Sequence, residues 1–178
     1  MTPPEFSRPV RIDTLGEAPR TLSIEANEAE CEALARRFGL QGIETLRAKA
    51  DLSRRGESIR AAGALTARVT QSCVGTGLPV PATVQEAFHI EFRPHPASGS
   101  PDEEVELGEH DLDVVFYDGA SVDFGEAVAE TLSLALDPYP RAPNADAALA
   151  EVGVKPEGEE GPRGALAGLK DLLGKPKG

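Results

Sequence analysis

The side chains best suited to chemistry in this chain are two cysteines and three histidines, namely Cys31, Cys73, His89, His95 and His110. Thiolate and imidazole groups are the usual ligands of zinc, and a cysteine beside a histidine can act as a nucleophile. Zinc sites need paired spacings such as Cys-x-x-Cys or His-x-x-x-His, and neither spacing occurs here. We therefore predict no metal site and no cofactor.

Cys73 is the strongest candidate for a nucleophile. It continues the apolar face of an alternating segment that begins at Ile59, so we interpret it as a buried structural thiol. No group near it in the sequence is expected to lower its pKa. A serine nucleophile elbow and a phosphate-binding loop are both missing from the chain. We expect a protein that is not an enzyme and takes no small-molecule substrate, with a Cys73 thiol-dependent enzyme as the less favoured alternative.

Four basic residues could form a nucleic-acid surface. Two adjacent strands are expected to carry them on their outward faces, and they are Arg47, Lys49, Arg60 and Arg68. No aromatic side chains interleave with them to stack on bases. An ordinary surface paired with Asp and Glu is the favoured interpretation, and direct RNA binding remains open as an alternative.

The net charge of −12 is unevenly distributed. Residues 1–70 hold 11 Lys and Arg against 10 Asp and Glu, whereas residues 71–178 hold 7 against 20. The stretch from Asp102 to Glu130 contains 11 carboxylates and no Lys or Arg. Such a surface repels nucleic acid and attracts a basic partner, although a solvated face that maintains solubility is the simpler interpretation.

Size and composition indicate one domain. A chain of 178 residues can bury a single core, and aromatic residues make up only 4% of it, so aliphatic side chains must supply most of the packing. The chain opens without a basic region or an apolar run, and it has no stretch of roughly 20 apolar residues that could span a bilayer. We expect a soluble cytoplasmic protein, not associated with a membrane, whose thiols are free.

The first two strands and the first helix are predicted from changes in the spacing of apolar residues along the chain. Two short strands are expected within residues 6–24, where apolar residues alternate on either side of a Gly-Glu-Ala-Pro break. A helix is predicted over residues 28–38, because Asn27 and Glu30 form a capping-box pattern and Gly39 follows the last apolar position.

A hairpin and a second helix follow. Residues 46–52 and 59–73 alternate as strands, and residues 75–79 connect the second of them to a return strand over 84–92. Residues 112–117 predict a further strand, and Asp123 starts a helix that is expected to end near Asp137 because Pro138 disfavours its continuation. The sequence thus predicts an α+β fold in which a mainly antiparallel sheet is packed by two helices.

The predicted domain covers residues 5–141, and residues 142–178 are expected to form a flexible acidic and proline-rich tail. Within this tail, about 142–162 is interpreted as a linker. Leu166, Leu169 and Leu173 predict a short amphipathic helix over 165–173.

Several segments, in this order, resemble one bacterial family. They are Leu34–Leu40, Val69–Thr76, Phe88–Phe92, Asp123–Glu130 and Leu136–Arg141. In order and spacing they resemble the YceD family of large ribosomal RNA subunit accumulation proteins, over about residues 5–143. Many members of that family carry Cys-x-x-Cys after the long strand, and Thr76 stands here in place of the second cysteine.

The resemblance implies a cytoplasmic, non-enzymatic factor that supports synthesis, processing or stability of large-subunit ribosomal RNA, and hence ribosome biogenesis. We expect it to act through protein–protein contacts, with a large-subunit ribosomal protein or a ribosomal RNA precursor as the hypothetical partner. The family-signature residues, which are candidates for partner contact, are Gln71, Cys73, Tyr139 and Arg141.

Overall fold

A computed structural model describes residues 4–95 and 113–154 of the chain. The described strands are β1 (Pro9–Arg11), β2 (Arg20–Glu25), β3 (Gly42–Arg55), β4 (Ser58–Ser72), β5 (Pro79–Pro94), β6 (Asp113–Tyr117) and β7 (Ser121–Asp123). The described helices are the 3-10 turn η1 (Ile12–Thr14), α1 (Glu28–Phe38), α2 (Phe124–Ala135) and α3 (Ala145–Glu151). The α+β prediction is confirmed.

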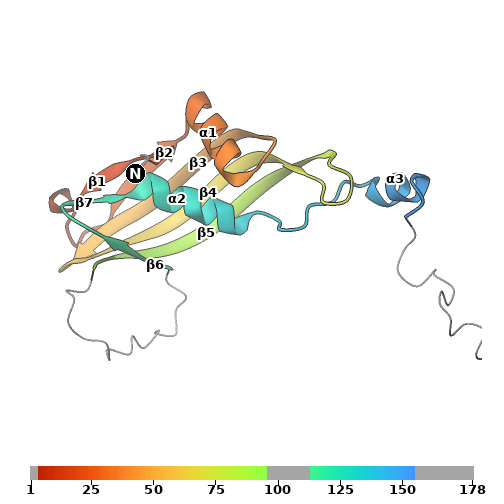
Figure 1. Ribbon diagram of the computed structural model, residues 1–178. Coiled ribbons are helices and arrows are strands. Elements are labelled where there is room, and N and C mark those ends of the chain that lie inside the picture. The colour runs from red at the N-terminus through yellow and green to blue at the C-terminus, as the bar shows by residue number, and fades with distance from the viewer. Residues whose placement is uncertain (1–3, 96–112, 155–178) are drawn as a thin grey trace, which may run out of the picture.

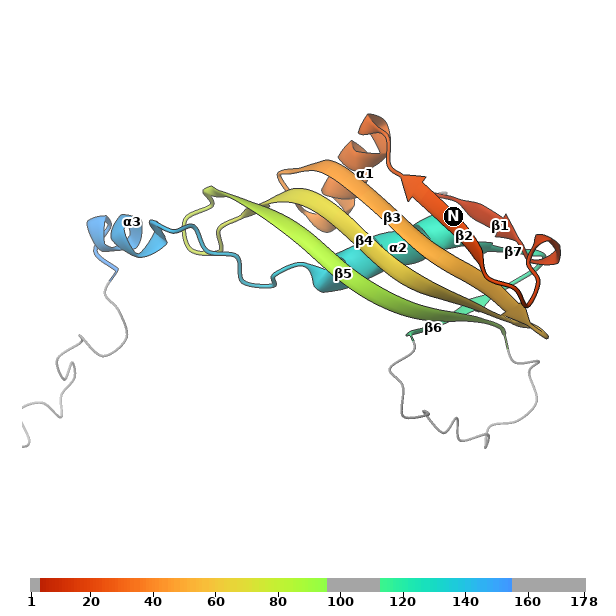
Figure 2. The same cartoon turned by 180° about the vertical axis from the view of Figure 1, so that it is seen from behind.

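The main sheet has five strands in the order β2-β3-β4-β5-β6, and β1 pairs with β7 in a separate two-stranded sheet. Four neighbouring strands pair antiparallel, whereas β6 runs parallel to β5. Both α1 and α2 lie on the same face of the main sheet (Figure 1). Seen from behind, the other face of the sheet is turned to the viewer and the two helices lie beyond it (Figure 2).

Helix α1 begins and ends where its capping residues predict. The Asn27 side chain accepts from the Glu30 amide at 3.0 Å, and the Glu30 carboxylate accepts from the Asn27 amide at 2.8 Å. Gly39 has a φ of 66°, a left-handed conformation that glycine adopts without steric cost. The prediction of a helix over 28–38 is therefore confirmed at both ends.

The core lies between the inward face of the sheet and the two helices. Along β4, buried and exposed residues alternate over almost the whole strand, as the predicted period of two requires. The side chains of Phe124, Val128 and Leu132 on α2 have no measurable exposure and face this layer. Burial of each such side chain contributes about 1.5–3 kcal/mol. The long hairpin predicted from the alternation is confirmed, with Ser72 opposite Pro79.

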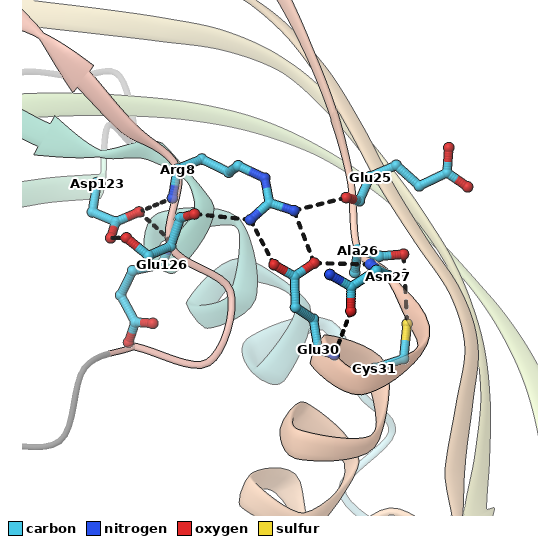
Figure 3. A network of polar contacts seen from close by, with 9 residues as sticks. Arg8, Glu25, Ala26, Asn27, Glu30, Cys31, Asp123 and Glu126 are labelled. Carbon is cyan, nitrogen blue, oxygen red and sulfur yellow. Dashed lines mark hydrogen bonds and ion pairs between the residues drawn. The ribbon is translucent and has the colours of Figure 1, made fainter.

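Charged groups join the N-terminal segment to the starts of both helices (Figure 3). The Arg8 guanidinium donates to the two Glu30 carboxylate oxygens at 2.7 and 2.8 Å and to the Glu25 carbonyl at 3.0 Å. The Arg8 amide donates to Asp123 at 2.8 Å, and Asp123 also caps α2 by accepting from the Glu126 amide. We call Arg8, Glu30 and Asp123 the Arg8 clamp. Hydrogen bonds from Arg8 hold the pKa of Glu30 below its usual value.

Helix α3 was not predicted. The sequence interpretation treated about 142–162 as a linker, and for residues 145–151 that interpretation is wrong, because they form a short helix with Ala145 fully buried. Helix α2 ends at Ala135, two residues before its predicted end, since Leu136 is already extended. The amphipathic helix predicted over 165–173 lies outside the described residues, as does most of the acidic run, from Asp102 to Asp111.

Candidate functional site

The turn between β4 and β5 forms the far end of the long hairpin. Its backbone is fixed by two hydrogen bonds of 2.8 Å each, from the Gly77 amide to the Cys73 carbonyl and from the Cys73 amide to the Leu78 carbonyl. The Gln41 side chain, from the connection between α1 and β3, donates to the Ser72 hydroxyl and to the Gly77 carbonyl. The turn is thus attached to the body of the protein.

The segment after α2 crosses the same end of the sheet. The Gln71 side chain, which is 7% exposed, donates to the Asp137 carbonyl at 2.8 Å. The Val74 amide donates to the Pro140 carbonyl at 2.9 Å. These two bonds join residues more than sixty positions apart and hold residues 137–142 against the hairpin turn.

Cys73 is enclosed at this junction, with only 3% of its surface exposed, in a small cluster with Val80, Ala142 and Ala145. The prediction that it is a buried thiol is confirmed. The expectation that nothing lowers its pKa is wrong: the Thr76 hydroxyl and then the backbone of Ala142 lower the pKa of Cys73 to about 7. Thr76 therefore acts on this thiol from three residues further along the chain.

Helix α3 packs onto the same turn. A side chain at Gly75 would bring its Cβ to 3.2 Å from Leu149 Cδ1, so the two segments are in close contact. Arg141 lies at the start of this region and pairs with Asp146 at 2.6 Å. In Figure 1, α3 lies beyond the hairpin turn, at the opposite end of the molecule from β6.

Exposed apolar side chains gather on these three segments. Among the described residues, seven large hydrophobic side chains are exposed, and five of them belong to the turn, the crossing segment and the residues directly after α3: Val74, Leu78, Tyr139, Val152 and Val154. We call these five residues the hairpin-end surface. Tyr139 and Val152 are the most exposed of the five, at 75% and 76%.

The structure thus brings the four candidate contact residues Gln71, Cys73, Tyr139 and Arg141 to one end of the molecule, and their role in partner contact stays a prediction. Gln71 and Cys73 face inward and hold the segments together, whereas Tyr139 points to solvent. The sequence interpretation missed Val152 and Val154, which fell within the expected linker. Their apolar spacing after Leu149, downstream of a helix-starting Asn144, was the available signal.

The four basic residues proposed for RNA lie on the outward face of β3 and β4, as predicted, and all are exposed. Arg47 pairs with Glu25 at 2.9 Å, and Arg68 pairs with Glu44 at 2.6 Å. Lys49 and Arg60 have no ion-pair partner within the described residues. Arg47 and Lys49 line a shallow depression of about 490 Å³ on this face.

Two carboxylates in the described part of the acidic run serve the fold. Asp123 belongs to the Arg8 clamp, and Glu126 pairs with Arg37 at 2.6 Å.

Within residues 4–95 and 113–154, no group of three or more His, Cys, Asp and Glu side chains is placed to hold a metal ion. In the same part of the chain, no helix is long and apolar enough to cross a membrane.

Residues 61–173 match the family described as "Large ribosomal RNA subunit accumulation protein YceD", and the match includes all but the first three residues of the β4–β5 hairpin, together with α2 and α3. The matched segment is 113 of the 178 residues. The chain belongs to the YceD family. This YceD-family segment also contains every residue of the hairpin-end surface. The family description supports a ribosome-related role in general. Searches of curated proteins and of solved structures found no match.

Proposed function

We propose that this chain is a cytoplasmic, non-enzymatic factor that supports the accumulation of large-subunit ribosomal RNA through protein–protein contacts at the hairpin-end surface. The observation that carries the proposal is the concentration of five exposed apolar side chains on three segments that meet at one end. Exposed large apolar side chains that gather in one region are typical of interaction sites, and tyrosine is enriched in such interfaces.

The charges near this surface favour a basic partner. Asp137 and Glu151 are exposed beside the apolar residues, whereas Arg141 is engaged by Asp146. A partner with an apolar segment flanked by Lys or Arg would bury the apolar side chains and pair with these carboxylates. Proteins that bind ribosomal RNA carry such cations, because they neutralise phosphates. A large-subunit ribosomal protein therefore fits this surface better than naked RNA does.

The test compares two surfaces of the same chain in cells that lack their own copy. Val74→Ser with Tyr139→Ser removes apolar area from the hairpin-end surface, and both side chains are exposed, so the fold should be unaffected. We expect large-subunit proteins to be lost from the purified complex and large-subunit RNA to fall relative to small-subunit RNA. Measurements are the ribosome profile and RNA quantitation.

The matched control is Phe116→Ser, because Phe116 is 49% exposed on β6, at the other end of the molecule. This control should retain normal RNA amounts and partner capture. Normal large-subunit RNA in the Val74/Tyr139 variant, at wild-type protein abundance, would contradict the proposed function.

A second candidate function is direct RNA binding on the outward sheet face. It is favoured by Lys49 and Arg60, two exposed cations with no ion-pair partner in the part of the chain that the structure describes. Replacing both by Ala should weaken RNA binding and reduce the slope of log K against log salt by about 0.7 for each cation. Arg36→Ala on α1 is the control, since Arg36 is also exposed but lies on the helix side of the sheet. Unchanged affinity in the Lys49/Arg60 variant removes this candidate.

A further inference from the structure

The outer edge of β2 carries free backbone groups in a predictable pattern. The Ala26 amide donates to the Leu46 carbonyl, which continues the β2–β3 register as a hydrogen-bonded pair. Hydrogen-bonded and non-hydrogen-bonded residue pairs alternate along an antiparallel ladder, so the backbone groups of residues 20, 22 and 24 also bond to β3. The N–H and C=O groups of Thr21, Ser23 and Glu25 therefore point away from β3. The Arg8 guanidinium bonds to the Glu25 carbonyl from that side, as this pattern requires.

The same reasoning gives the free edge of β1. The Ile12 amide donates to the Ala120 carbonyl, and the Phe124 amide donates to the Arg8 carbonyl. Residues 8, 10 and 12 thus bond toward β7, and the backbone groups of Pro9 and Arg11 point the other way. The Arg11 carbonyl is taken by the Thr14 hydroxyl at 2.7 Å. The Pro9 carbonyl and the Arg11 amide are left on the edge that faces β2.

A groove of about 270 Å³ separates these two edges. Strands β1 and β2 belong to different sheets and are not hydrogen-bonded to each other. The apolar lining consists of Pro9, Val10, Leu15, Leu22 and Leu52, and Thr14 lies beside η1. Arg11 and Arg20 complete the lining. Arg11 already pairs with Asp13 through two hydrogen bonds, whereas Arg20 has no ion-pair partner within the described residues. At one end, Arg8 reaches across the gap to Glu25 (Figure 3).

We propose that this groove accepts an extended segment of a partner protein, which adds as a strand between β1 and β2 and joins the two sheets. An unpaired strand edge is a template for another strand, and here two such edges face one groove. Backbone bonds to Thr21 and Ser23 supply affinity. Alternate side chains of the added segment point into the apolar lining beside Leu22 and Leu52.

The charge of the lining selects the chemistry of the segment. Arg20 has no partner of its own within the described residues and lies on the same face of β2 as Leu22, so it favours a carboxylate on the incoming strand, since opposite charges across an interface set specificity. The segment is therefore one that carries small apolar residues and, at the end beside Arg20, one Asp or Glu on the same face. This inference is independent of the proposed function, because it concerns the opposite end of the sheet from the hairpin-end surface and a partner of the opposite charge.

The experiment uses the full 178-residue chain and capped hexapeptide probes. The first probe, called the valine–glutamate probe, is Val-Thr-Val-Thr-Glu-Thr, so that valine and glutamate share one face of the extended peptide. The second, called the valine–lysine probe, has lysine in place of glutamate, and the third is the first with alternate backbone nitrogens methylated. Amide exchange of Thr21 and Ser23 is followed by NMR. We expect the valine–glutamate probe to slow exchange at both amides by at least tenfold at saturation, and the other two probes to leave it unchanged.

The decisive variant is Ser23→Pro. It removes a backbone donor on the free edge of β2, and proline is tolerated where an edge-strand N–H faces outward. Wild-type melting temperature with loss of probe binding is the expected result. Lys49→Ala, which changes a neighbouring side chain on the outward face of the sheet, should bind the probe like the wild type.

A second variant covers the case in which Ser23→Pro does not fold. Arg20→Glu should shift the preference from the valine–glutamate probe toward the valine–lysine probe. The proposal is overturned if no probe protects Thr21 and Ser23, if the methylated probe binds as well as its parent, or if a folded Ser23→Pro chain binds with unchanged affinity.

Discussion

The Arg8 clamp and the hairpin end are both places where distant parts of the chain meet, but opposite kinds of contact hold them together. At the clamp, the Arg8 guanidinium donates to the Glu30 carboxylate and to the Glu25 carbonyl, and the Asp123 carboxylate caps α2 (Figure 3). At the hairpin end, the segments are joined by the Gln71 side chain, a backbone hydrogen bond and contacts of small side chains around Cys73. Large apolar side chains remain outside.

This difference separates a structural site from a contact site. The polar groups of the clamp satisfy one another, so they have little left to offer a partner. At the hairpin end, the buried groups fix the backbone while Tyr139, Val152 and Val154 stay in water at a free-energy cost that binding would remove. Substitutions at the clamp should therefore lower stability, and substitutions on the hairpin-end surface should lower function.

The largest loss of stability is expected at Gly125, beside the clamp. A Cβ at this position would lie 2.1 Å from the Phe6 carbonyl oxygen and 2.9 Å from the Arg8 amide, and both contacts are with backbone. Gly125→Ala must push the N-terminal segment away from α2, which should cost about 3 kcal/mol in the free energy of unfolding. Urea denaturation measures this loss. Gly16→Ala is the control, because a Cβ there meets nothing within 4 Å.

A smaller loss is expected from Arg8→Ala, which leaves Glu30 without its partner. The two side chains are 30% and 17% exposed, so the loss should be about 2 kcal/mol at neutral pH. The double variant with Glu30→Ala should lose less than the sum of the single variants. An additive double variant would show that the pair contributes nothing of its own.

The pH dependence of this pair has a definite sign. Arg8 lowers the pKa of Glu30 in the folded state from its ordinary 4.5. The resulting stabilisation is fully present above pH 4.5 and is lost as the pH falls through the lowered folded-state pKa. The difference in stability between wild type and Arg8→Ala should therefore shrink at acidic pH. If the difference in stability between the wild type and Arg8→Ala stayed constant until Glu30 was fully protonated, the stabilisation by Arg8 would not be electrostatic.

Much of the fold could be predicted because its signals are local. Helix α1 was predicted at both ends from Asn27, Glu30 and Gly39, and the hairpin followed from a period of two that holds over β4 and most of β5. The parallel pairing of β6 with β5 could not be predicted, since it depends on which distant strand edge is free when β6 forms.

The candidate site divides in the same way. The alternation of apolar and polar residues along β4 predicts that Cys73 lies on a buried face. The groups that lower its pKa, however, include the backbone of Ala142, which the crossing segment brings from a distant part of the sequence. Helix α3 has only one large apolar side chain, Leu149, and is held by the contact of Leu149 with the turn and by the packing of Ala145 with Cys73. Composition alone therefore made it look like a linker.

At the hairpin end, the first test concerns the crossing segment. Gln71→Ala removes the hydrogen bond to the Asp137 carbonyl and should cost about 1 kcal/mol. Tyr139→Ser should change stability by less than about 0.5 kcal/mol, because the side chain is exposed. Urea denaturation of both variants checks the ranking. A Tyr139→Ser chain less stable than Gln71→Ala would mean that Tyr139 is a structural residue.

The smallest effect is expected at the thiol of Cys73, and it separates a buried structural cysteine from a catalytic one. The Thr76 hydroxyl is the main cause that lowers the pKa of Cys73 to about 7, so Thr76→Val should raise that pKa toward its ordinary 9.0. The thiolate stabilises the folded state fully above pH 9 and loses this effect as the pH falls through about 7.

Iodoacetamide alkylation, followed by mass spectrometry of the Cys73 peptide, measures both the accessibility and the pKa of the Cys73 thiol. At 3% exposure the wild-type thiol should react much more slowly than a free thiol, and the midpoint of its pH profile should move upward in Thr76→Val. Cys31 serves as the internal control, because burial raises its pKa and it should stay unreactive at neutral pH. Rapid alkylation of folded Cys73 near pH 7 would mean an accessible thiolate, which would favour the thiol-dependent enzyme over a purely structural role for this residue.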